Sequence, residues 1–170
     1  AGLPKQIQGI MNHTKSPFNN VKIRRAFMMA FDVEKAMLAA VGPRDFWRLC
    51  GSTMLCGSAL NSTAGEKGIY NAMNIEEAKK IVAAEGLAGT EVIVMSAEER
   101  SQMRGTAHVA RETLEDIGFK VKFMATDWAT ISQRRTKPDL WDFFVTWWGG
   151  GRTTIDGLLD VDALLPGGWH

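Results

Sequence analysis

The sequence predicts an α/β domain with a mostly parallel sheet flanked by helices, and two features of its second half carry that prediction. From residue 91 onward, segments typical of strands and helices alternate, and a helix that connects two strands brings them into a sheet in parallel. The last strand, FFVTW, is a continuous apolar run typical of a strand covered on both faces. The strands are expected at 91–95, 120–125 and 143–147, with helices at about 97–117 and 127–135.

The first half of the chain predicts one strand and two helices. Residues 6–12 (QIQGIMN) are expected to form the strand. Asn20 and Asp32 are suitable N-caps for the two helices that follow. Helical spacing predicts inward-facing apolar side chains at Ile23, Phe27, Ala30 and Phe31 in the first helix and at Ala36, Met37, Ala40 and Val41 in the second.

Two paired signals mark helix starts further along the chain. Asn74 with Glu77 resembles a capping box, and Gly86 is expected to end the helix that follows it. Ser96 with Glu99 repeats the signal at the start of the long helix. The inward-facing positions of the long helix are predicted to be Met103, Ala107, Ala110, Leu114 and Ile117.

The segment from about 43 to 73 lacks periodicity and is expected to be a long irregular loop. Such a loop is uncommon in a compact domain unless it has a function or a covalent staple. It contains Cys50 and Cys56, whose five-residue gap does not match the spacing of metal knuckles or redox pairs. By spacing alone, a local disulfide and two buried free thiols both remain open.

The totals exclude several classes of function. The 20 basic and 19 acidic side chains give a net charge of +1, so no nucleic-acid partner is predicted. No apolar run approaches the roughly 18 residues that would span a bilayer. The three histidines are scattered, so no metal site is expected, and no dinucleotide, phosphate-loop or nucleophile motif predicts a cofactor or catalysis. The sequence therefore predicts no enzyme.

Glycine and tryptophan gather where the last strand ends. Gly149 to Gly151 follow that strand directly, so a ligand could approach the backbone there, although a tight turn explains the glycines equally well. The planar fork of the adjacent Arg152 suits a carboxylate, or could simply be solvated. Trp148 is expected to contact a ligand. Core packing is the preferred interpretation for Trp141 and Trp147.

The segment from residue 12 to residue 37 resembles the signature of the family 5 extracytoplasmic solute-binding proteins, the dipeptide, oligopeptide and nickel type. In that signature, Pro-Phe and Asn or Asp precede a Val-x-Ile-Arg-x-Ala helix, and an Asp then opens the next helix. The matching residues here are Pro17, Phe18, Asn20, Val21, Ile23, Arg24, Ala26 and Asp32. The resemblance continues through the later helices and strands and covers about residues 6–151.

The resemblance implies that residues 1–170 are a single lobe, most of the C-terminal lobe of a two-lobed binding protein, with a periplasmic-binding-protein-like fold. Such a protein closes around a peptide or another small solute in the periplasm and passes it to an ABC permease. Its partners would be that solute, the remaining lobe and the permease. An oxidising compartment also favours the Cys50–Cys56 disulfide.

The resemblance also implies ligand-binding residues. In peptide-binding relatives, an arginine on the short helix after Asp-Trp and the residues after the aromatic strand contact the ligand. By position these are Arg134 or Arg135, then Trp148, Gly149 and Gly151. Many relatives have an aspartate where Gly151 stands, which weakens the prediction of a simple dipeptide ligand.

Two other classes of function compete with transport. One is a protein-interaction domain that uses the aromatic cluster, and the other is an enzyme with Cys50 or Cys56 as its nucleophile.

Overall fold

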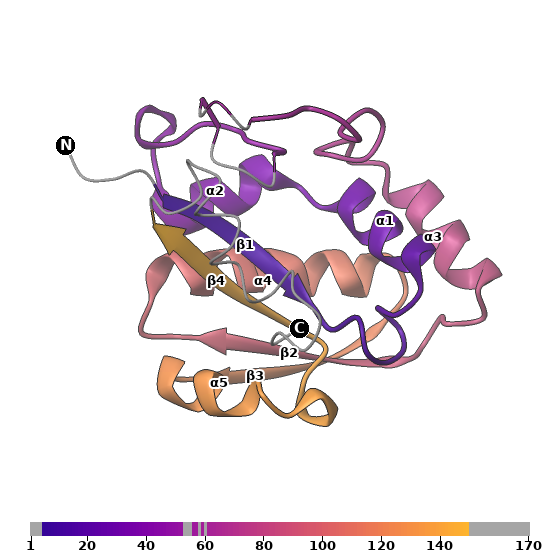
Figure 1. Cartoon of the computed structure of the whole chain (residues 1–170). Helices are drawn as coiled ribbons and strands as arrows, with labels where there is room; N and C mark the ends of the chain where they lie inside the picture. The colour runs from indigo at the N-terminus through magenta and orange to yellow at the C-terminus, as the bar shows by residue number, and fades with distance from the viewer. Residues whose placement is uncertain (1–4, 53–55, 58, 60, 150–170) are drawn as a thin grey trace.

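The structure, a computed structural model, describes residues 5–52, 56–57, 59 and 61–149. Strands and helices follow one another as the sequence predicts (Figure 1). The elements are β1 (Lys5–Met11), α1 (Val21–Ala30), α2 (Val33–Val41), the 3-10 helix η1 (Arg44–Phe46), α3 (Ile75–Ala84), β2 (Glu91–Ala97), α4 (Ser101–Asp116), β3 (Lys120–Thr126), α5 (Trp128–Arg134), the 3-10 helix η2 (Pro138–Leu140) and β4 (Phe143–Gly149).

The four strands form one mixed sheet in the order β1-β4-β2-β3. β2 pairs in parallel with both β3 and β4, which confirms the parallel sheet expected from the second half of the chain. β1 is the exception, because it pairs antiparallel to β4, with Lys5 opposite Gly149 and Met11 opposite Phe143. The sheet is therefore mostly parallel with one antiparallel edge strand.

The order of the strands places α4 and α5 on opposite faces of the sheet. The chain moves outward from β2 to β3 through α4 and then returns past β2 to β4 through α5. Since both crossovers are right-handed by the general rule, reversing the direction reverses the face that the helix covers. Residues 143–146 of β4 are buried, as predicted for a strand covered on both faces.

The core is centred on α4, which packs on the sheet with one side and on α2 with the other. The inward-facing residues predicted for α4 are all buried, and so are Ile23, Phe27 and Ala30 of α1. At the α2 crossing, a Cβ on Gly105 would lie 2.4 Å from the Ala39 carbonyl oxygen. The two helix backbones therefore approach more closely than any side chain at position 105 allows.

The predicted start of α4 is wrong. β2 continues through Ser96 to Ala97, where the Ser96 hydroxyl donates to the Glu98 carboxylate. Glu99 does not cap α4 either; its carboxylate accepts the Trp128 backbone N–H at 2.9 Å and thereby holds the start of α5. The caps predicted at Asn20, Asp32 and Asn74 are confirmed, because each side chain accepts a backbone N–H of its helix. 

Buried polar side chains join β1 to the start of β4. Asn12 is fully buried, and its amide donates to the carbonyl oxygens of Pro138 and Trp141 at 2.7 and 2.9 Å. The Asp142 carboxylate accepts the Ile93 backbone N–H at 2.7 Å and lies 3.1 Å from the Lys15 amino group. Each buried acceptor therefore has a partner, as a stable fold requires.

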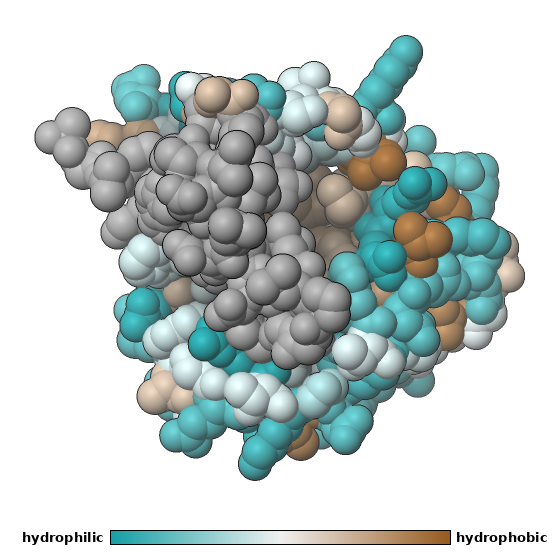
Figure 2. All heavy atoms as spheres, in the orientation of Figure 1, coloured by the Kyte–Doolittle hydropathy of each residue, from teal (hydrophilic) through white to brown (hydrophobic). Residues whose placement is uncertain are grey.

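Hydrophobic side chains also reach the surface on the side where α1 and α3 lie (Figure 2). Val21 and Met28 of α1 and Ile75 of α3 are among the exposed residues. Most of the remaining coloured surface in that view is hydrophilic.

Candidate ligand-binding cavity

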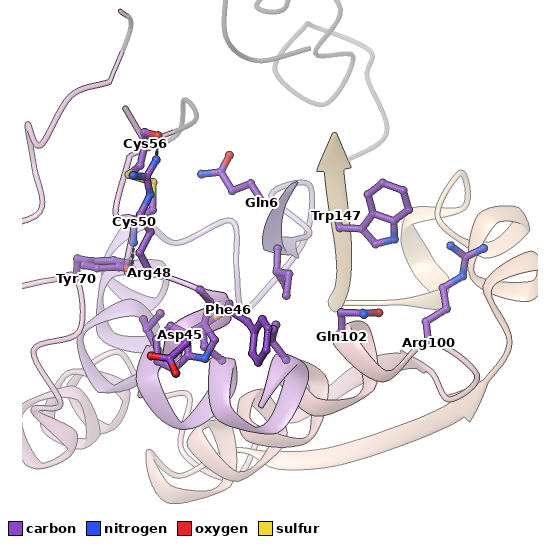
Figure 3. Close-up of a pocket in the computed structure, with 15 residues that line it drawn as sticks. Gln6, Asp45, Phe46, Arg48, Cys50, Cys56, Tyr70, Arg100, Gln102 and Trp147 are labelled. Atoms are coloured by element: carbon purple, nitrogen blue, oxygen red, sulfur yellow. Dashed lines mark hydrogen bonds between the residues drawn. A yellow bond between two sulfur atoms is a disulfide. The ribbon is translucent and has the colours of Figure 1, made fainter. Parts of the chain in front are cut away.

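A cavity of about 760 Å³ opens beside the carboxyl end of β4. Its lining comes from the start of β1, from α2, from the connection between α2 and α3, from the start of α4 and from the end of β4. In Figure 3, Arg100, Gln102 and Trp147 lie on one side of the cavity, and the disulfide, Arg48 and Tyr70 lie on the other. Its volume is in the range of small-molecule sites.

One wall of the cavity is held by a disulfide. Cys50 and Cys56 are bonded, with their Cα atoms 5.8 Å apart, which confirms the disulfide favoured by the resemblance. The Cys50 backbone N–H donates to the Tyr70 hydroxyl at 2.9 Å, and the Arg48 guanidinium donates to the Cys56 carbonyl oxygen. We call Arg48, Cys50, Cys56 and Tyr70 the disulfide wall.

A hydrogen bond connects the sheet to the segment that carries the disulfide wall. The Gln6 side-chain amide, at the start of β1, donates to the Ser52 carbonyl oxygen at 2.7 Å. Burial raises the pKa of the Tyr70 phenol above its ordinary value of 10.0, and this effect outweighs the hydrogen bond from Cys50, which lowers it. Tyr70 is therefore a neutral hydroxyl at the edge of the cavity at physiological pH.

The opposite side of the cavity carries a positive charge on Arg100. Its guanidinium carbon lies 5.3 Å from the centre of the Trp128 ring, within the range of a cation–π contact. Its Nε forms an ion pair with the Glu99 carboxylate at 3.6 Å, a distance too long for a hydrogen bond. Within the residues that the structure describes, the Arg100 guanidinium donates no hydrogen bond. Its N–H groups can therefore donate to an anionic group of a ligand.

A third part of the lining is apolar. Val33, Met37 and Val41 follow one another at helical spacing along α2, and Ile7 of β1 joins them. Two predictions for α2 need correction here. Ala36 and Ala40 do face the core, but Met37 is only half-buried and Val41 is exposed, because the cavity lies over that side of the helix.

The two tryptophans assigned to the core differ from each other. Trp141 is fully buried, and its indole N–H donates to the Arg135 carbonyl oxygen at 3.1 Å, which agrees with the prediction. Trp147 is half-buried; it packs against the core, as predicted, and also lines the cavity. It packs against the core on one side and can contact a ligand on the other.

The ligand-binding residues predicted from the resemblance lie partly outside the cavity. Arg134 and Arg135 stand at the end of α5 and do not line it, although the Arg135 guanidinium lies 5.9 Å from the Trp128 ring that Arg100 also contacts. The backbones of Trp148 and Gly149 pair with Gln6 and Lys5 at the end of β4. The predictions for Gly151 and Arg152 lie outside the described residues, so all six assignments stay predictions.

Sequence reasoning missed Arg100, Phe46 and Tyr70 in the lining. Arg100 was hidden by the wrong helix start, which placed it inside a helix, whereas it is the N-cap residue of α4. A signal was present for Tyr70, the single tyrosine of the chain, because it ends the irregular loop that holds both cysteines.

Metal chemistry and membrane insertion find no support in the described part of the chain. None of its residues form a group of three or more potential metal ligands. None of its helices is both long and apolar enough to cross a bilayer. Both cysteines are in the disulfide, so the alternative with a thiol nucleophile lacks the free thiol that it requires.

Comparison with known proteins agrees with this fold and cavity. Residues 8–162 match the family described as bacterial extracellular solute-binding proteins, family 5. Because the match covers most of the chain, the chain belongs to this family.

A probable peptide ABC transporter periplasmic-binding protein from Sinorhizobium fredii is 26% identical over 141 residues, which are 80% of this chain and 27% of that protein. The solved structure of the PBP AgaA from A. tumefaciens R10 with agropinic acid is 25% identical, covers 92% of this chain and 31% of its own, and has a TM-score of 0.73. DppA from Helicobacter pylori, solved with the peptide STSA, has the same fold at 16% identity and a TM-score of 0.69, over 93% of this chain and 29% of its own. The chain thus spans about a third or less of the length of these relatives.

Proposed function

We propose that the chain is one lobe of a periplasmic solute-binding protein that captures a peptide, or another small solute with a carboxylate, for an ABC importer. The observation that carries the proposal is the cavity at the end of β4, with the Arg100 guanidinium on one side. Family membership supports the transport role, and the disulfide suits an oxidising compartment.

Arg100 supports a carboxylate as the recognised group. A guanidinium makes paired hydrogen bonds to a carboxylate, and hydrogen bonds between charged groups are stronger than neutral ones. Of two relatives that are at least a quarter identical, one is described as a probable peptide-binding protein and the other was solved with agropinic acid. A peptide C-terminus and an organic acid both carry a carboxylate. The charge on Arg100 and these two ligands therefore favour the same class of solute.

Binding would proceed by closure of two lobes. The cavity is open on this chain, and the chain spans only about a third of the length of its solved relatives. Residues of the second lobe would cover the ligand and exclude water, which strengthens the contact between Arg100 and the carboxylate. A ligand that contacts both lobes stabilises the closed form, which the permease would recognise.

The test is calorimetric titration of the full-length protein with a mixed di- to pentapeptide library. Each peptide that binds is then titrated individually. Replacing Arg100 by Ala should weaken binding at least about tenfold, because hydrogen bonds to a charged group are lost. Arg104→Ala is the matched control, since Arg104 is exposed on the same helix and does not line the cavity. C-terminal amidation of the peptide should weaken wild-type binding and leave the Arg100→Ala variant unaffected.

The results separate the parts of the proposal. Saturable binding that depends on Arg100 and on the free carboxylate supports both the site and the ligand class. Binding that Arg100→Ala leaves unchanged would move the site away from this cavity. Failure of every peptide, together with binding of non-peptide organic acids, would keep the transport function and reject the peptide.

A further inference from the structure

Part of the cavity lining is apolar, and much of this part comes from α2. Val33, Met37 and Val41 lie on one side of α2, and the other side of the helix packs on α4 through Ala36 and Ala40. α2 therefore separates the core from the cavity and presents apolar side chains to both.

Phe46 extends this apolar part beyond the helix. It is 75% exposed, although it lines the cavity. Figure 3 shows its ring over α2, with Arg100 and Gln102 farther along the cavity at the start of α4. An exposed phenylalanine in a cavity can bury its ring against an apolar group of a ligand, which removes apolar surface from water.

The neighbours of Phe46 fix its position without covering it. The Arg44 guanidinium carbon lies 4.1 Å from the centre of the Trp47 ring, and the Trp47 indole N–H donates to the Gly42 carbonyl oxygen at 2.8 Å. The first contact lies within η1 and its C-cap, and the second holds η1 to Gly42, the C-cap of α2. The Phe46 ring is thus placed at the cavity by a fixed backbone and not by packing of the ring itself.

We infer that Phe46, Val41 and Met37 form an apolar subsite that takes an aliphatic or aromatic side chain of the bound peptide. This inference rests on the proposed function and adds a specificity to it. A peptide whose carboxylate meets Arg100 would extend across the cavity toward η1. Peptides with a bulky apolar residue would then bind more tightly than equally long peptides of small or polar residues.

The test uses the full-length protein and a set of tripeptides in which serine, leucine or phenylalanine occupies one position among alanines. Wild-type protein should bind the best leucine or phenylalanine peptide about tenfold more tightly than its serine counterpart, because the ring of Phe46 and the peptide side chain leave water together. Phe46→Ala should abolish most of this difference, and Phe46→Leu should restore part of it. Leu38→Ala is the control, because Leu38 is exposed on α2 but does not line the cavity.

The readout is the ratio of dissociation constants between apolar and serine peptides, which a general loss of folding would not change selectively. A ratio near one in wild type overturns the subsite while the proposed function stands. A loss of affinity in Phe46→Ala that is equal for all peptides also overturns it, because Phe46 then serves lobe closure or another contact. Absence of binding by every tripeptide overturns the subsite together with peptide recognition.

Discussion

The contact between α2 and α4 and the disulfide wall lie on either side of α2 and are stabilised in different ways. The helix contact is buried and close, and Gly105 lets the two backbones approach. The disulfide wall is only half-buried or exposed, and a covalent bond and a few hydrogen bonds hold it in place. The difference indicates that close packing stabilises the domain. The shape of the cavity depends instead on a disulfide and a few hydrogen bonds.

The largest effect is expected at the helix contact. Gly105→Val should lower the free energy of unfolding by about 3 kcal/mol, since the new side chain meets the rigid backbone of α2 and the structure must shift. Chemical denaturation of the isolated chain measures this. Glu115→Ala on the exposed side of α4 should change the free energy by less than about 0.5 kcal/mol. Equal stabilities of the two variants would show that the helices can move apart without cost.

Loss of the disulfide is expected to have a smaller effect on stability, together with a clear effect on ligand binding in the cavity. Replacing Cys50 and Cys56 together by serine should lower the free energy of unfolding by about 2 kcal/mol, because the bond closes only a short loop. The affinity of the full-length protein for its ligand should fall as well, as the wall loses its fixed shape. Reduction of the wild type should reproduce both changes, and unchanged affinity after reduction would show that the wall is rigid without the bond.

The smallest effect concerns the ionisation of Tyr70. Because burial raises the pKa of this phenol in the folded chain, the unfolded chain loses its proton first as the pH rises. The contribution of Tyr70 to stability is therefore constant below pH 10 and decreases above it. Since Tyr70 is the single tyrosine, an ultraviolet titration of the isolated chain should show a midpoint above 10.0. A midpoint at or below the ordinary value would contradict burial of this group.

The sequence predicted the helix contact better than it predicted the cavity. Apolar periodicity identifies Met103 and Leu114 as core residues because each side chain on a helix keeps its direction over the whole element. The cavity depends on distant segments meeting, and no local pattern shows that Met37 and Ala36, neighbours on one helix, face a cavity and a core respectively. Trp147 shows the same limit, since a buried strand can still present one side chain to a cavity at its end.

The capping signal at Ser96 and Glu99 failed for a related reason. The Ser96 hydroxyl does form a short-range hydrogen bond, to Glu98, but the Glu99 carboxylate accepts the backbone N–H of Trp128, at the start of α5. A contact between residues so far apart in sequence outweighed the local preference.

The antiparallel edge strand has a consequence for the order of assembly. β1 comes first in the chain, but its partner is β4, so Lys5 meets Gly149 only after every other described element has been made. Pairing of such distant segments carries a high cost in chain entropy and is slow. On the ribosome, β1 would emerge early and wait unpaired while β2, α4 and β3 form a local unit. This sheet is therefore expected to assemble from the β2–β3 side toward β1, with β1, the first of its four described strands in the sequence, joining last.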